Sequence, residues 1–212
     1  MEAGPSKVNL KQGVSIITCT NRQSYLRNLF SNYARQRHAK KELVIIVNND
    51  AIPLAPYQRL ANKHSNIQIM RLPGHLTLGA CLNYAVKKTK YSFIAKFDDD
   101  DYYATGYLTD SMRVMSQTGA DIVGKRAHYM YLNGKKLLLL RYYNKADQYV
   151  SIVQGATLLA KRYVFSRVWF PDQNRGECVK FCSDCLTKGF KIYSGSPYNF
   201  LAIRRQNSRG HT

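Results

Sequence analysis

The chain has 212 residues, of which 45% are hydrophobic and 21% are charged, a balance that is typical of a folded globular protein and excludes general disorder. No apolar run approaches the roughly 18 residues of a membrane-spanning helix. The 32 Lys and Arg against 13 Asp and Glu give a net charge of +19, which favours an anionic partner such as nucleic acid, a phosphorylated metabolite, an anionic polymer or a membrane surface. Because the N-terminus is polar and lacks a signal region, we expect a cytoplasmic protein with reduced cysteines.

The first half of the chain alternates strands with helices. Apolar, β-branched runs predict buried strands at 14–19, 43–47, 67–72 and 92–97, helical periodicity predicts helices near 24–37, 56–64, 78–89 and 105–117, and a short strand follows at 121–124. This alternation predicts an α/β fold, a single Rossmann-like domain with a mostly parallel central sheet flanked by helices. Ligands bind such sheets beyond the carboxyl ends of the strands. Polar clusters follow three of those ends, at 18–22, 48–50 and 98–101.

The second half predicts a smaller mixed or antiparallel part. Two apolar runs flank Asn133-Gly134, which indicates a hairpin. Further along, we expect strand–turn–strand at 150–160, a short helix at 162–168, a helix at about 176–188 that ends at Gly189, and a last strand at 191–194.

Four of the 13 acidic residues form one run, Asp98-Asp99-Asp100-Asp101. Alternate residues of a strand share a face, so Asp98 and Asp100 can offer two hard oxygen ligands to Mg²⁺ or Mn²⁺. The alternative is an acidic turn or helix N-terminus, where the helix dipole favours Asp. Because four consecutive Asp exceed any capping need, we predict a divalent cation site whose coordination is completed by substrate phosphates.

Five segments carry a resemblance to a known family: VSIITCTNR, ELVIIVNND, LGACLNYAVKKTKYSFIAKFDDDDYY, QGATLLAKRYVF and FPDQNRGECVKF. In this order they resemble glycosyltransferase family 2, inverting enzymes of the GT-A fold, from about Val14 to Thr212. The tail YNFLAIRRQNSRGHT is similar to that of small bacterial members, some linked to spore-coat or cell-surface glycosylation. The resemblance implies one GT-A domain over 1–212, with a leader at 1–13, a nucleotide-binding half at 14–124, an acceptor and catalytic half at 125–203 and a basic tail at 204–212.

The resemblance also implies roles for individual residues. The nucleotide site would comprise Thr18, Thr20, Asn21, Arg22, Asn48, Asn49, Leu78, Gly79, Asn83, Asp98 and Asp99. Asn48 and Asn49 stand where the family usually has acids, although amides can still hydrogen-bond a base or a hydroxyl. The metal would be held by Asp98, Asp100 and His211, and the donor sugar would lie above Gln154 and Gly155.

Basic residues offer a separate expectation. Lys125, Arg126, Arg204 and Arg205 can neutralise a diphosphate leaving group, although any one of them is more often a surface charge. We place Lys125 and Arg126 among the candidates for the donor and acceptor site.

The catalytic base departs from the family pattern. Inversion needs a carboxylate that deprotonates the acceptor hydroxyl, and the family usually supplies it from a Glu-Asp pair at the start of a late helix. Here the pair is Glu177-Cys178. Glu177 is the first candidate and Asp172 the second, and a weak or inactive transferase is the third possibility. The alternative role of Glu177 is an acid favoured by the helix dipole.

The sequence therefore predicts an inverting, metal-dependent transferase that uses a nucleotide-diphosphate sugar, with a UDP-sugar the expected donor and a glycan, lipid-linked or protein acceptor. The alternative is a catalytically weak or inactive GT-A-fold module that binds an anionic polymer or nucleic acid. The four Asp would repel phosphate without a metal, so we expect no specific nucleic acid. A nucleotidyltransferase would carry a Gly-rich loop near the first strand, and TCTNR has no Gly. Peripheral contact with an anionic membrane or spore surface is also expected.

Overall fold

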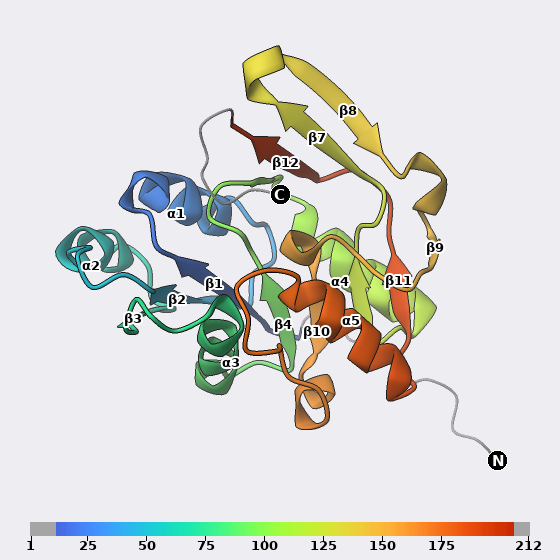
Figure 1. Ribbon diagram of the computed structural model, residues 1–212, viewed down its shortest axis with the longest axis horizontal. Coiled ribbons are helices and arrows are strands. Elements are labelled where there is room, and N and C mark those ends of the chain that lie inside the picture. The colour runs from blue at the N-terminus through green and yellow to red at the C-terminus, as the bar shows by residue number, and fades with distance from the viewer. Residues whose placement is uncertain (1–11, 206–212) are drawn as a thin grey trace.

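The computed structural model describes residues 12–205, which build two sheets with helices packed around them (Figure 1). The strands of the larger sheet are β1 Val14–Thr20, β2 Lys41–Val47, β3 Ile67–Arg71, β4 Phe93–Lys96, β6 Ile122–Gly124, β9 Gln148–Tyr149, β10 Leu159–Lys161 and β11 Ile192–Ser194. Their order across the sheet is β3-β2-β1-β4-β10-β6-β11-β9. The smaller sheet joins β5 Tyr102–Tyr103, β12 Phe200–Arg204, β7 His128–Leu132 and β8 Leu137–Arg141, in that order.

Helices cover the larger sheet on both faces. The α-helices are α1 Leu26–Ala34, α2 Ala55–Ala61, α3 Leu78–Lys88, α4 Tyr107–Thr118 and α5 Glu177–Thr187. Short 3-10 turns are η1 Gln23–Tyr25, η2 Asn133–Lys135, η3 Tyr143–Lys145, η4 Gly155–Thr157 and η5 Arg162–Ser166. One apolar core contains side chains of α1, α2 and α4, and the other contains side chains of α3 and α5. Alternation along β1 feeds both cores, because Ile16 enters the first and Ile17 the second.

The parallel strands bring three loops to one edge of the sheet. β1 pairs in parallel with β2 on one side and with β4 on the other. The segments that follow these three strands therefore leave the sheet at the same edge, where ligands bind in parallel α/β folds. Beyond β4 the sheet becomes mixed, since β10 runs antiparallel to both β4 and β6.

The predicted α/β architecture and the antiparallel part are confirmed, with local differences. The helix expected at 24–37 is divided into η1 and α1, and the strand–turn–strand expected at 150–160 is η4 followed by β10 alone. Three strands had no counterpart in the sequence prediction: β5, β9 and β12. The first two have only two residues each, too few to produce a period-two pattern. Within residues 12–205, none of the helices is long and apolar enough to span a bilayer.

Candidate active site

The carboxyl ends of β1, β2 and β4 meet at an open cleft of about 370 Å³. Its lining residues are Cys19, Thr20, Asn21, Arg22, Asn48, Leu78, Asp98, Asp99, Asp100, Asn174 and Arg175. The three polar clusters that the sequence placed after separate strands thus share one cleft. The loop before α5 adds Asn174 and Arg175, for which the sequence analysis predicted no role.

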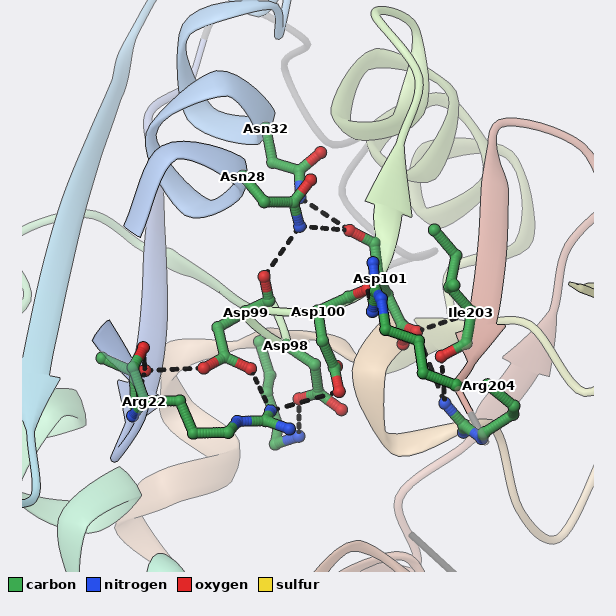
Figure 2. A network of polar contacts seen from close by, with 12 residues as sticks. Arg22, Asn28, Asn32, Asp98, Asp99, Asp100, Asp101, Ile203 and Arg204 are labelled. Atoms are coloured by element: carbon green, nitrogen blue, oxygen red, sulfur yellow. Dashed lines mark hydrogen bonds and ion pairs between the residues drawn. The ribbon is translucent and has the colours of Figure 1, made fainter. Parts of the chain in front are cut away.

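Cationic side chains of the protein contact each carboxylate of the acidic run (Figure 2). Lys96 pairs with Asp98, and the guanidinium of Arg22 pairs with Asp99 and, at 3.1 Å, with Asp100. Asp99 also accepts a hydrogen bond of 2.6 Å from the Thr20 hydroxyl. The paired charges explain how four neighbouring acids are tolerated at the end of a buried strand.

Asp101, the last member of the run, faces the smaller sheet. Its Oδ1 atom accepts a hydrogen bond of 2.9 Å from the backbone N–H of Ile203, and it lies 3.5 Å from the Arg204 guanidinium. Its Oδ2 atom is buried and has no hydrogen-bond partner among the described residues. Asp101 therefore joins the acidic run to β12.

Two asparagines of α1 hold the backbone of the run (Figure 2). Asn28 Nδ2 donates to the carbonyl oxygens of Asp99 and Asp101, at 2.7 and 2.9 Å, and Asn32 Nδ2 donates to that of Asp101 at 2.8 Å. Because Asn28 and Asn32 lie four residues apart, they share one face of the helix. The helix thereby fixes the turn that presents the carboxylates.

Burial weakens the acidity of two of the four carboxyl groups. It raises the pKa of Asp99 to about 6, assisted by Asp100 and opposed by Arg22 and Thr20. It raises the pKa of Asp101 to about 8, assisted by Asp98 and Asp100 and opposed by Arg204 and the Ile203 N–H. A further cation near the run would favour its charged form.

Lys96 is a site residue that the sequence analysis overlooked. Its side chain is 4% exposed and points from β4 to Asp98. Burial would lower the pKa of Lys96, but the nearby Asp98, Cys178 and Glu177 outweigh that effect and raise it. The ammonium therefore lies between the acidic run and the first turn of α5. A lysine within the apolar strand FIAK was the available signal, since lysines are almost never fully buried unless paired.

Asp98 and Asp100 have the chemistry of a site for a divalent cation. Both carboxylates line the cleft, and the Asp98 side chain is 38% exposed. Among residues 12–205, no group of three or more His, Cys, Asp or Glu could hold a metal ion. The described part of the chain would thus supply two ligands, which fits Mg²⁺, an ion commonly held by one or two carboxylates together with phosphates and water. His211, the third predicted ligand, lies outside the described residues.

The segment 170–176 is attached to the first turns of α3. Asn83 exchanges two hydrogen bonds with the backbone of Phe170, of 2.8 and 3.0 Å. The Leu78 N–H donates to Asn174 Oδ1 at 2.9 Å, and the Thr77 hydroxyl, which caps α3, also donates to Asp172. A Cβ atom on Gly79 would lie only 1.7 Å from the Pro171 carbonyl oxygen. Gly79 and Asn83 therefore hold this segment, whereas Leu78 lines the cleft.

Glu177 and Cys178 lie in the first turn of α5, and Gly176 separates them from Arg175, the last residue that lines the cleft. The Cys178 thiol donates to Glu177 Oε1 at 3.3 Å, and both side chains are buried. A Cβ atom on Gly155 would lie 2.6 Å from Cys178 Sγ, so this glycine permits η4 to pack against α5. Gln154 N–H donates to the Lys125 carbonyl at 2.9 Å. Asp172 is exposed and bonded to Thr77.

Four other candidates lie outside the cleft lining. Lys125 is buried, donates to the Ser196 carbonyl at 2.6 Å and lies 3.8 Å from Asp110. Burial lowers its pKa to about 8, which Asp110 and Asp147 oppose. Arg126 stacks over Tyr142. Thr18 is buried, and its hydroxyl has no hydrogen-bond partner within residues 12–205, whereas Asn49 donates to the Asn21 carbonyl at 3.2 Å.

Comparisons with known proteins agree on one family and one fold. A family model described as "Glycosyl transferase family 2" matches residues 15–169. The O-antigen biosynthesis glycosyltransferase WbnJ of Escherichia coli is 28% identical over 196 residues, which cover 87% of this chain and 73% of that protein.

Solved structures show the fold. The mannosyltransferase PcManGT of Pyrobaculum calidifontis, in complex with GDP-Man and Mn²⁺, matches with a TM-score of 0.76 and 16% identity, covering 99% of this chain and 61% of that one. S. aureus TarS 1–349 in complex with UDP-GlcNAc matches with a TM-score of 0.74 and 16% identity, covering 93% and 60%. This chain thus spans about three fifths of each. The predicted GT-A fold is confirmed.

Proposed function

Because the chain belongs to glycosyl transferase family 2, we propose that it moves a sugar, with inversion, from a nucleotide-diphosphate sugar to an acceptor hydroxyl with the help of a divalent metal. The observation that carries the proposal is the shared cleft, where Asp98 and Asp100 lie beside the residues that follow β1 and β2. In one glycosyltransferase domain, residues 14–124 would bind the nucleotide and residues 125–203 would bind the acceptor and carry out the transfer.

The nucleotide would occupy the part of the cleft formed by Thr20, Asn21 and Asn48. Asn21 and Asn48 offer amides for hydrogen bonds to a base or ribose, whereas the Thr20 hydroxyl already donates to Asp99. The solved structures of similar fold named above are complexes with UDP-GlcNAc and with GDP-Man and Mn²⁺. A UDP-sugar is the first donor to test and a GDP-sugar the second, because Asn48 and Asn49 replace the usual acids and their amides can hydrogen-bond either base.

The diphosphate would meet positive charge from two sources. Asp98 and Asp100 would hold Mn²⁺ or Mg²⁺, which would offset the charge that develops on the leaving diphosphate. Arg22 and Arg175 line the same cleft and would contribute fixed positive charge. Arg22 already contacts Asp99 and Asp100, so it also keeps the carboxylates in place.

Glu177 is the proposed general base. It follows the cleft residues Asn174 and Arg175 at the start of α5, and the Cys178 thiol donates to it. The second candidate, Asp172, accepts a hydrogen bond from the cap of α3, a contact that supports a role in holding the loop. A carboxylate at Glu177 would accept the acceptor proton as the hydroxyl attacks the anomeric carbon and the nucleotide diphosphate leaves.

Replacing Glu177 tests this function. A thermal-shift panel of UDP-, GDP-, CDP- and dTDP-sugars, each with and without Mn²⁺, first selects the donor. Glu177→Gln should then lower transfer by roughly 10²–10⁴-fold while nucleotide affinity stays near that of the wild type. Asp172→Asn is the matched carboxylate control and should have the smaller effect. Cys178→Asp restores the usual family residue; if it raises transfer strongly while Glu177→Gln changes little, Glu177 is not the base.

A further inference from the structure

The outer face of the smaller sheet is apolar, and the contacts of its rings with other described residues are those of Tyr129 with Tyr198 and of Tyr102 with the Arg35 guanidinium. Successive residues of a strand point to opposite faces. Met130 of β7 and Ala202 of β12 are buried in the core, so their neighbours Tyr129 and Leu201 point outward. Residues directly opposite one another share a face, and Leu201 lies opposite both Tyr129 on β7 and Tyr102 on β5.

Two rows of apolar and aromatic side chains cross this outer face. The first row is Tyr102, Leu201, Tyr129 and Leu140, and the second is Ile203, Tyr131 and Leu138. Tyr102 directly follows Asp101, so the first row begins at the acidic run and ends on the edge strand β8. Figure 1 shows the β7–β8 hairpin at the periphery of the molecule, far from α2 and α3.

The edge strand β8 exposes leucines on both of its faces. Leu138 and Leu140, on the outer face, are 57% and 41% exposed, and Leu137 and Leu139, on the other face, are 44% and 36% exposed. No strand described here pairs with the free edge of β8. Natural proteins usually protect such an edge with charges or proline, whereas this one presents four consecutive leucines.

The charge around these leucines has one sign. The hairpin and its flanks, residues 128–145, contain Lys135, Lys136, Arg141 and Lys145 and no Asp or Glu. Lys135 and Lys136 lie at the tip of the hairpin, and Arg141 ends β8. Apolar side chains flanked by lysine and arginine are typical of segments that bind an anionic membrane surface.

We propose that the β7–β8 hairpin, together with the outer face of the smaller sheet, docks onto the surface of an anionic lipid bilayer. The leucines of β8 enter the interface between headgroups and acyl chains, while the basic side chains contact the anionic headgroups. This goes beyond the proposed sugar transfer, and its test needs no transfer assay.

Two other occupants fit the observations less well. Antiparallel pairing of β8 with a second copy, centred on Leu139, would bring the Lys135-Lys136 tip of each hairpin to the Arg141 end of the other, and residues 128–145 contain no Asp or Glu to offset the repulsion. A protein packed on the outer face would cover Leu138 and Leu140 but leave Leu137 and Leu139 exposed. A lipid interface surrounds the strand and covers both pairs.

Vesicle sedimentation tests the proposal with the full chain. At physiological salt the wild type should bind vesicles of phosphatidylcholine and phosphatidylglycerol and should not bind phosphatidylcholine alone. Leu138→Gln/Leu140→Gln and Lys135→Gln/Lys136→Gln should each weaken the partition coefficient by roughly tenfold or more. The matched controls are Leu186→Gln, an exposed leucine of α5, and Lys63→Gln/Lys188→Gln, which should bind like the wild type.

A spectroscopic variant reports the depth of insertion. The variant combines Trp169→Phe, which removes the chain's single tryptophan, with Leu138→Trp, which places a tryptophan on β8. The fluorescence emission of this new tryptophan should shift to the blue when anionic vesicles are added. No binding by the wild type, or equal binding by the hairpin variants and the controls, would overturn the proposal. If the wild type does not bind vesicles but forms a dimer that Leu138→Gln/Leu140→Gln dissociates, the partner of this surface is a second copy of the chain and not a membrane.

Discussion

The buried ammonium of Lys96 forms an ion pair with the more exposed carboxylate of Asp98, at the point where β4 ends. Their side chains are 4% and 38% exposed. The ion pair therefore connects the interior of the sheet with the cleft. If the pair is broken, water can solvate Asp98 but not the buried ammonium of Lys96.

Asp98→Asn should lower the free energy of unfolding by about 1–3 kcal/mol, less than for a fully buried pair because Asp98 is partly solvated. The cause is an uncompensated buried ammonium. Adding Lys96→Met should restore most of the loss, since an apolar side chain of similar length removes that charge. Urea denaturation of the two single variants and the double variant measures the coupling, and additive effects would contradict this account of the pair.

Gly79→Ala should detach the segment 170–176 from α3. A Cβ atom there would lie 1.7 Å from the Pro171 carbonyl oxygen, so we expect a loss of about 1–3 kcal/mol in folding stability, although alanine is the better helix former. Nucleotide affinity should fall as well, because Asn174 and Arg175 line the cleft. Gly195→Ala is the control, since its nearest contact would be 3.6 Å. If Gly79→Ala is more stable than the wild type, the segment 170–176 can move away from α3 without loss of folding stability, which would contradict this prediction.

His128 should make folding stability depend on pH. Burial lowers the pKa of His128 from an ordinary value of 6.5 to about 4. The positive charges of Arg141, Arg204 and Arg126 lower it further, whereas the hydrogen bond to the Arg126 carbonyl raises it. The unfolded chain therefore binds the proton more readily. The stability from neutral His128 is complete above pH 6.5 and is lost as the pH falls toward 4.

His128→Phe checks this directly. Between pH 7 and pH 5 the wild type should lose about 1–2 kcal/mol more folding stability than this variant. Chemical denaturation at both pH values supplies the comparison. An equal loss in the two proteins would mean that His128 is accessible to protons in the folded state.

Nucleic acid should bind only through charge. The net charge of +19 predicts weak, sequence-independent binding to DNA at low salt that disappears near physiological salt, because counterion release drives it. Fluorescence anisotropy with two unrelated duplexes over a salt series measures it. Tight, sequence-selective binding at physiological salt would instead favour the binding-module alternative over the transferase.

The sequence predicted what local patterns encode. Buried runs such as 43–47 and the helical periodicity of 78–89 specify their own elements, and the strand ends located the polar clusters that meet at the cleft. Long-range pairing was less accessible. Strand β12 is defined by its pairing with β5 and β7, which the sequence did not predict. The contacts of Lys96 with Asp98 and with α5 likewise depend on how β4 packs against that helix.

Individual site residues show the same limit. The roles of Gly79 and Asn83 come from contacts with Pro171 and Phe170, which are distant in sequence. Lys125 stands in a strongly basic chain, where sequence could not distinguish a buried lysine from one that faces the cleft. The acidic run was informative because acids are scarce in this chain.

The proposed function requires Asp98 and Asp100 to hold a divalent metal that binds the diphosphate of a nucleotide sugar. Isothermal titration calorimetry of the wild type and Asp100→Asn with UDP, with and without Mn²⁺, tests this requirement, and it is repeated with GDP if UDP does not bind. Asp184→Asn, on α5, is the control. We expect Mn²⁺-dependent binding by the wild type and the control, and loss of that dependence in a folded Asp100→Asn. Nucleotide binding by Asp100→Asn with unchanged dependence on Mn²⁺ would contradict it.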